Sequence, residues 1–191
     1  MTAPSWQARL LSFALRQTFK RQLAAAQDVS QVRRLMGREP GGQRPQMQIE
    51  AWPHEGGVGE RLRCLRTPPQ ARLLYLHGGG FVACSPRTHR PITAALARRG
   101  FEVWVPDYGL APEHPFPHAL EQLLAVHAQA CEGLDSPGHL VLAGDSAGGG
   151  LVLSLMLLLR QEGGALPAAA ALLSPFADLT LSGPSILANG E

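Results

Sequence analysis

The residues of this chain that are best suited to chemistry lie in the pentapeptide Gly-Asp-Ser-Ala-Gly at positions 144–148. The apolar run 139–143 precedes it, and a longer apolar run, 147–161, continues from it. Where a strand turns sharply into a helix through G-x-S-x-G, the serine hydroxyl is exposed, and the glycines leave space where the backbone approaches itself. The bare pattern is weakly specific, so its position between a strand and a helix decides the interpretation. We therefore predict that Ser146 is a nucleophile.

A second loop, His-Gly-Gly-Gly-Phe at positions 77–81, follows the apolar run 72–76. Consecutive glycines allow bare backbone N–H groups to converge on a reacting oxygen, which is how an oxyanion hole is built. A flexible turn is the simpler interpretation of a glycine run. A histidine followed by three glycines is rarer by chance than G-x-S-x-G, however, and we predict that this loop faces the nucleophile.

The elements that must position these loops alternate along the chain. Short apolar runs at 72–76, 102–105, 139–143 and 168–173 predict strands, and the stretches 88–99, 117–131 and 147–161 predict helices. Such alternation favours a parallel sheet covered by helices on both faces. Binding sites in these sheets lie at the carboxyl ends of the strands, where both loops occur.

The first 42 residues have a different pattern of apolar residues, which predicts helices without strands. Apolar residues recur at helical spacing up to position 36, with Asp28 as a predicted N-cap and Gly37 as a predicted stop. Two amphipathic helices of this length need an apolar surface to cover, as a lid or a docking arm. After a break rich in proline and glycine, the runs 47–52 and 60–66 predict a hairpin that turns at Gly56-Gly57. We divide the chain into a helical segment, 1–42, and an α/β domain, 43–191.

These features together resemble the hormone-sensitive-lipase family of α/β-hydrolase esterases. The resemblance covers about residues 70–185 and rests on four motifs in family order, at 77–81, 107–117, 144–149 and 173–180. It implies an α/β-hydrolase fold, with a mostly parallel sheet, flanking helices and an N-terminal helical cap. It also implies hydrolysis of a small carboxylic ester through an acyl-enzyme, without a metal or a dissociable cofactor.

The resemblance assigns roles residue by residue. Ser146 is the nucleophile, and the backbone amides of Gly78, Gly79 and Ala147 form the oxyanion hole. His77 resembles an anchor of its loop and not a base.

Other positions of the motifs are structural by the same resemblance. Asp145 and Asp107 belong to this group and stay off the catalytic set. Gly109 and Gly150 stand where the family usually has Arg and Asn, which changes local ion pairing or hydrogen bonding and leaves the chemistry intact.

A serine nucleophile needs a base, and in this fold the acid and the histidine follow the serine in the chain. No histidine follows Ser146, and Asp178 belongs to a motif that precedes the family's triad acid. By resemblance the chain stops after the sixth of eight strands, without the triad Asp and His. The strand at 168–173 is then expected to be an exposed edge that favours self-association.

Four histidines upstream of Ser146 are candidate substitutes for the base: His54, His89, His114 and His118. We interpret each as a solvated or capping residue, because the sequence places no carboxylate beside it.

Composition limits the other possibilities. The chain has 191 residues, 45% of them apolar and 17% charged, which suits one domain with a sizeable core. Its net charge of +2 implies no polyanionic partner, although positions 1–99 are basic and positions 100–191 acidic. Three cysteines without C-x-x-C spacing suggest a reduced compartment, and we expect a cytoplasmic protein. We find no signal peptide, and the apolar stretch 147–159 is too short to span a bilayer.

The leading hypothesis is a serine carboxylesterase that acts on small uncharged or short-acyl esters. Three alternatives remain open: a hydrolase with an unusual base or one from a second subunit, a catalytically silent binding scaffold, and a nucleic-acid binder. The last is the weakest, because the basic residues interleave with apolar ones and few aromatic residues are available for stacking.

Overall fold

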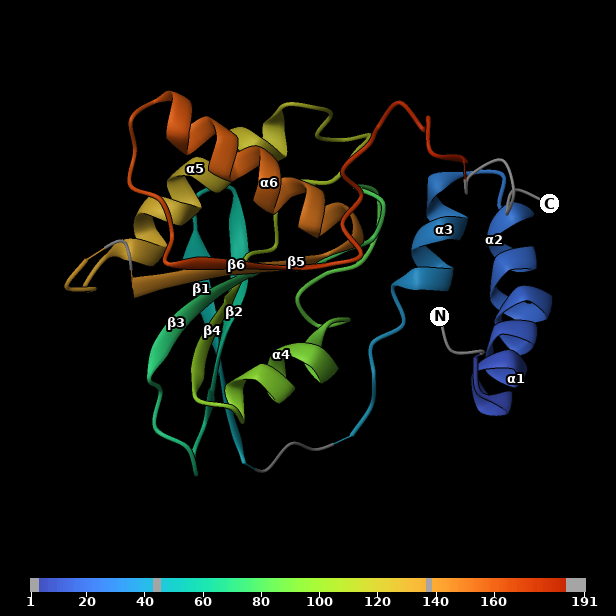
Figure 1. Cartoon of the computed structure of the whole chain (residues 1–191), viewed down its shortest axis with the longest axis horizontal. Helices are drawn as coiled ribbons and strands as arrows, with labels where there is room; N and C mark the ends of the chain where they lie inside the picture. Colours follow the sequence, from blue (N-terminus) through green and yellow to red (C-terminus); the bar gives the residue numbers. More distant parts are fainter. Residues whose placement is uncertain (1–3, 43–45, 137–138, 185–191) are drawn as a thin grey trace.

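The computed structural model describes residues 4–42, 46–136 and 139–184, and within them the chain forms one six-stranded sheet with helices on both faces (Figure 1). The spatial order is β1-β2-β4-β3-β5-β6. The strands are β1 (Met47–His54), β2 (Gly57–Cys64), β3 (Ala71–Leu76), β4 (Phe101–Val105), β5 (Leu140–Asp145) and β6 (Ala169–Leu173). The strands β4, β3, β5 and β6 pair in parallel, whereas β1 with β2 and β2 with β4 are antiparallel.

Helices α5 (His118–Cys131) and α6 (Ser146–Gln161) cover one face of the sheet, and α4 (Arg90–Ala97) covers the other (Figure 1). The two-residue period of a strand divides its apolar side chains between these faces. In β3, Leu74 and Leu76 join the core under α5 and α6, whereas Leu73 and Tyr75 join the core under α4. Both cores are apolar, which explains why these strands read as unbroken hydrophobic runs.

The predicted α/β architecture is confirmed, and the predicted helices and parallel strands start and end within two residues of the observed ones. The hairpin differs slightly. Its strands extend further toward the turn, to His54 and from Gly57, so that Gly57 pairs with His54 and the turn consists of Glu55 and Gly56.

The N-terminal segment is helical as predicted, but it covers little of the domain. It contains α1 (Trp6–Leu15), a π-helical turn η1 (Arg16–Lys20), α2 (Arg21–Ala24) and α3 (Val29–Met36), and these helices lie beside the sheet domain (Figure 1). Asp28 caps α3 by accepting a hydrogen bond from the Gln31 N–H, at 2.8 Å, and Gly37 ends it. The apolar side chains of α1 are exposed, with Trp6 at 69% and Phe13 at 61%.

Arg33 makes most of the polar contacts that join this helical segment to the domain; the Cys84 thiol also donates to the Met36 carbonyl at 3.6 Å, and Glu39 pairs with Arg87 at 3.7 Å. Arg33 of α3 donates from Nε to the Val82 carbonyl, at 2.7 Å, and from a terminal nitrogen to the Ala111 carbonyl, at 3.0 Å. The same guanidinium forms a two-pronged ion pair with Glu113. Helix α3 is thus tied to the segments that follow the glycine loop and β4.

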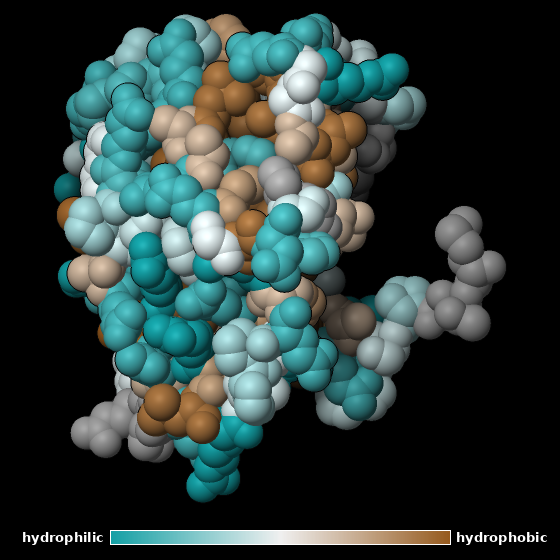
Figure 2. All heavy atoms as spheres, turned by 90° about the vertical axis from the view of Figure 1, so that its left-hand side faces the viewer, coloured by the Kyte–Doolittle hydropathy of each residue, from teal (hydrophilic) through white to brown (hydrophobic). Residues whose placement is uncertain are grey.

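Strand β6 is the exposed edge that the sequence predicts, since all five of its residues are exposed and it pairs only with β5 among the described strands. Its exposed residues include the large apolar Leu173, and Leu166, just before the strand, is exposed as well. Figure 2 shows hydrophobic residues at the surface among hydrophilic ones on the side of the molecule that carries α5 and the end of α6.

The uneven charge distribution reflects contacts between the two halves of the chain. Arg63 and Arg72 both pair with Glu102, and Arg33 pairs with Glu113. Among the described helices, none is long and apolar enough to cross a membrane. The three cysteines are free thiols.

Candidate active site

Ser146 lies where the chain turns from β5 into α6, and its backbone has a φ of +50°. This left-handed conformation is uncommon for a residue with a side chain and marks a constrained turn. A Cβ on Gly144 would lie 2.8 Å from the Leu76 carbonyl oxygen, and one on Gly148 would lie 2.5 Å from that of His77. Both flanking positions therefore need glycine, because the turn packs directly on the end of β3.

The loop that follows β3 is held by a buried histidine. The His77 ring is fully buried and stacks on Tyr108 with 4.4 Å between ring centroids, and the Tyr108 hydroxyl donates to the His77 carbonyl at 2.6 Å. His77 Nδ1 lies 2.9 Å from the Gly78 carbonyl, which only accepts, so Nδ1 carries the proton. Burial lowers the pKa of His77 to about 4. A neutral, enclosed ring supports the interpretation of His77 as an anchor.

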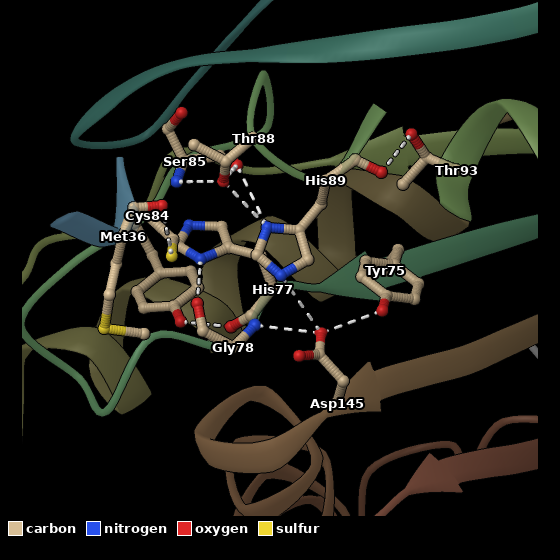
Figure 3. Close-up of polar contacts among 11 residues, drawn as sticks. Met36, Tyr75, His77, Gly78, Cys84, Ser85, Thr88, His89, Thr93 and Asp145 are labelled. Atoms are coloured by element: carbon tan, nitrogen blue, oxygen red, sulfur yellow. Dashed lines mark hydrogen bonds and ion pairs between the residues drawn. The ribbon is translucent and has the colours of Figure 1, made fainter. Parts of the chain in front are cut away.

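Asp145, the residue before Ser146, connects the two loops (Figure 3). Its Oδ1 accepts hydrogen bonds from the Gly78 N–H at 2.9 Å and from the Tyr75 hydroxyl at 2.8 Å, and it lies 3.4 Å from His89 Nε2. Burial alone would raise the pKa of this carboxyl, but hydrogen bonds from His89 and Tyr75 outweigh it and keep the pKa below its usual value. The carboxylate is therefore ionised and acts only as an acceptor.

The structure places the predicted oxyanion donors as follows. The Gly78 N–H donates to Asp145, which gives this group a partner that the sequence does not reveal. Gly79 lies next in the loop, and its carbonyl accepts the Val82 and Ala83 N–H groups at 3.2 and 3.0 Å. Ala147 is buried in the first turn of α6, where backbone N–H groups have no partner within the helix.

The interpretation of His89 as a residue without a carboxylate neighbour is wrong, because its Nε2 faces Asp145. The contact joins residues 56 positions apart and depends on β3 and β5 being neighbours, so no local pattern reveals it. His54 instead accepts the Asp107 N–H at 3.2 Å, and His114 stacks on His118.

No base stands beside the serine in the described part of the chain. All seven histidines lie within it, and none of them hydrogen-bonds to Ser146 Oγ. Asp178 holds its own turn by accepting from Thr180 and Ser182, and these hydrogen bonds lower its pKa to about 2. The described residues also contain no group of three His, Cys, Asp or Glu side chains suited to a metal ion.

An apolar pocket of about 510 Å³ adjoins the two loops. Phe81, at the end of the glycine loop, lines it together with Phe176, whose N–H donates to the Ser146 carbonyl at 2.8 Å. Leu153 and Leu157 of α6 form another wall, and no charged residue lines it. Phe13 of the helical segment lines a separate pocket on α1 and is not among the lining residues of the apolar pocket.

The profile of a protein family described as alpha/beta hydrolase fold matches residues 73–191. The chain belongs to the α/β-hydrolase family. This α/β-hydrolase is 45% identical over 114 residues to an acetyl-hydrolase of Streptomyces hygroscopicus, covering 59% of the chain and 38% of that relative. It is 34% identical over 167 residues to the hormone-sensitive lipase of Mus musculus, covering 84% of the chain and 19% of that lipase.

Solved structures agree. A crystal structure of EstE5 soaked with p-nitrophenyl butyrate superimposes with a TM-score of 0.86 at 32% identity, covering 98% of this chain and 64% of that one. An esterase of the bacterial hormone-sensitive lipase family gives a TM-score of 0.83 at 34% identity, covering 99% and 64%. The resemblance to this family is thus confirmed, and the chain spans less than two thirds of the length of these relatives.

Proposed function

We propose that the protein is a carboxylic ester hydrolase in which Ser146 attacks the ester carbonyl. The left-handed turn that presents Ser146 beside the glycine loop supports this most strongly. Ser146 Oγ forms a bond to the carbonyl carbon, and the π electrons of the C–O double bond move onto oxygen to give a tetrahedral oxyanion. The serine proton passes to solvent water, because no described histidine hydrogen-bonds to Ser146 Oγ. The oxyanion then collapses and expels the alcohol, which takes up a proton, and water releases the acid from the acyl-enzyme.

The oxyanion is held by backbone N–H groups in this proposal. Ala147 supplies one from the first turn of α6, and Gly79 supplies another from the loop. Gly78 was assigned the same role, but its N–H must leave Asp145, or be shared with it, to reach the substrate. We therefore assign Gly79 and Ala147 as the principal donors and Gly78 as a group that also positions the loop.

The substrate we propose is a small uncharged ester with a short acyl chain. The apolar pocket that adjoins the glycine loop at Phe81 and the start of α6 at Gly150 has no Asp, Glu, Lys or Arg in its lining, so a charged group would lose its hydration without a partner. A cavity of similar volume, about 530 Å³, has charged lining residues, but both of its arginines are already paired, Arg87 with Glu39 and Arg90 with Glu60. The apolar pocket is the better match to an ester.

Hydrolysis of p-nitrophenyl esters tests the proposal. Ser146→Ala is expected to abolish the acyl adduct that p-nitrophenyl butyrate leaves on the chain, seen as an added mass, whereas Ser30→Ala, which alters an exposed serine on α3 away from the pocket, leaves the adduct unchanged. The described residues place no hydrogen-bonded base at Ser146, so turnover should be small, because serine hydrolases that lack triad members retain about 10³–10⁴-fold acceleration over water. An acyl adduct that still forms on Ser146→Ala would refute the assignment.

A second candidate is a catalytically silent chain that binds esters as a scaffold. The absence of a histidine partner for Ser146 among the described residues favours it. A scaffold would bind p-nitrophenyl butyrate, seen as ligand-observed NMR saturation transfer, without releasing nitrophenol. Saturation transfer accompanied by Ser146-dependent release would exclude it.

The helical segment, the sheet edge, the thiols and the charge distribution support further proposals. We propose that residues 1–42 act as a cap segment of the domain, and that the exposed edge β6 allows self-association. Free thiols are consistent with a cytoplasmic location. The basic first half pairs with acids of the second half, which supports the view that nucleic acid is not a partner.

A further inference from the structure

We propose that His89 is a positioning residue for the glycine loop: through Asp145 it fixes the Gly78 amide, and thereby the loop, against the turn that carries Ser146. The role as a positioning residue for catalysis rests on the proposed function, because that function makes the loop an oxyanion hole. The contacts themselves do not depend on it.

The chain of contacts begins at the end of α4 that faces the site. His89 immediately precedes this helix, and its side chain is only 15% exposed. One edge of the ring meets Asp145 Oδ1 through Nε2, at 3.4 Å. The other edge meets the Thr88 hydroxyl through Nδ1, at 2.9 Å, and the Ser85 carbonyl at 3.4 Å (Figure 3). Both edges of the ring therefore have fixed polar neighbours.

The proton on His89 can be assigned from its partners. Asp145 is ionised and only accepts, so Nε2 must carry a proton for a favourable contact. The Thr88 hydroxyl accepts the Ser85 N–H at 3.0 Å and lies 2.8 Å from the Ser85 carbonyl. If the hydroxyl donates to that carbonyl, it accepts from His89 Nδ1; otherwise it donates to Nδ1. The ring thus stays oriented toward Asp145 in either arrangement of Thr88.

Asp145 passes this restraint to the loop. The oxygen that faces His89 is the one that accepts the Gly78 N–H, at 2.9 Å. The approach is close enough that a Cβ on Gly78 would lie 3.0 Å from Asp145 Cγ and closer still to Oδ2. A carboxylate that lost its His89 donor would keep Tyr75 and Gly78 but would have one polar neighbour fewer on Oδ1. The loop would then follow a carboxylate that can turn or take up water.

The wild-type chain gives the first test. A long-range ¹H–¹⁵N spectrum of the imidazole rings distinguishes protonated from unprotonated nitrogens. We expect His89 Nε2 to carry a proton. An unprotonated Nε2 would overturn the proposal, since two acceptors would then face each other.

Two variants give the second test, through the hydrogen-exchange rate of the Gly78 amide. His89→Leu removes the donor and keeps an apolar side chain, and exchange should accelerate by about tenfold or more, because a restraint on a charged acceptor is lost. His89→Gln retains an N–H donor near the position of Nε2, and its rate should stay within about threefold of wild type.

A matched control separates this effect from a general loss of stability. His127→Leu alters another buried histidine, on α5, far from the loop in sequence and without a contact to Asp145. We expect it to leave Gly78 exchange unchanged once the rates are compared at equal global stability. Similar acceleration in His127→Leu and His89→Leu, or no rescue by His89→Gln, would overturn the proposal. Because none of these measurements uses catalysis, an inactive Ser146 would refute the proposed function alone.

Discussion

The end of the sheet around Ser146 differs from helix α1 and strand β6 in how its side chains are packed. Around Ser146, the fully buried His77 and the partly buried Asp145 are hydrogen-bonded, and glycines stand where the backbone segments touch. In α1 and β6, by contrast, apolar side chains such as Phe13 and Leu173 face solvent. Enclosed polar groups must find partners, so they fix one geometry, whereas exposed apolar groups fix none. The molecule is therefore most strongly determined where its chemistry is proposed.

The largest expected difference between the two regions is in stability. Leu74 of β3 is fully buried, and Leu74→Ala should lower the free energy of unfolding by about 2–5 kcal/mol, the range for buried leucines. Leu10 of α1 is 60% exposed, and Leu10→Ala should change it by less than about 0.5 kcal/mol. Urea denaturation of both variants measures this. Equal losses would mean that α1 is packed in solution.

A second prediction concerns pH and the buried anchor. Because burial lowers the pKa of His77 to about 4 while the unfolded chain keeps the ordinary value, the unfolded state binds a proton first as pH falls. The free energy of unfolding should therefore fall by about 3 kcal/mol between about pH 6.5 and pH 4. His77→Asn keeps a donor for the Gly78 carbonyl and should flatten this slope in urea titrations. An unchanged slope would show that other groups cause it.

Within the network, the Tyr75 hydroxyl should matter more than that of Tyr108. Tyr75 donates to the ionised Asp145, and Tyr75→Phe is expected to cost about 1.5–3 kcal/mol, the range for hydrogen bonds to charged groups. Tyr108 donates to a neutral carbonyl, and Tyr108→Phe should cost about 1 kcal/mol. Thermal unfolding of the two variants compares their losses of stability. A larger loss in Tyr108→Phe would contradict the prediction that Tyr75 donates to an ionised Asp145.

The smallest expected effect is at the junction between the regions. Arg33 and Glu113 are partly exposed, so Arg33→Gln should change global stability by less than about 1 kcal/mol. Local exchange in α3 should nevertheless accelerate, because the guanidinium supplies the main polar tie to the domain. Hydrogen exchange measured by mass spectrometry reports this, with Arg34→Gln on the same helix as the control.

The same junction has its own pH dependence. The hydrogen bond from Arg33 lowers the pKa of Glu113 to about 2. A carboxyl whose pKa is depressed in the folded state stabilises the contact above its ordinary pKa and loses this effect as pH falls toward about 2. Protection of α3 should therefore persist at pH 5 and decline below about pH 4. Hydrogen-exchange protection of α3 that is independent of pH would show that the Arg33–Glu113 ion pair does not hold this helix.

Local sequence patterns were sufficient for the elements and for the two loops. The glycines of residues 77–81 and 144–148 mark both loops in the sequence itself, so the loops can be predicted without the fold. The contact between His89 and Asp145 was missed because it depends on strand order, which no local pattern encodes. The exposure of α1 was missed for a related reason: helical periodicity reveals an apolar face but not the surface that covers it.

The central claim is that Ser146 is the reactive group, and intact-mass analysis with a fluorophosphonate probe tests it most directly. The serine oxygen displaces fluoride from phosphorus, so one probe adduct should appear on the 20.4 kDa chain and should be lost in Ser146→Ala. Peptide mapping should place the adduct on residue 146. An adduct on another residue, or none on a folded chain, would contradict the account and favour the silent scaffold.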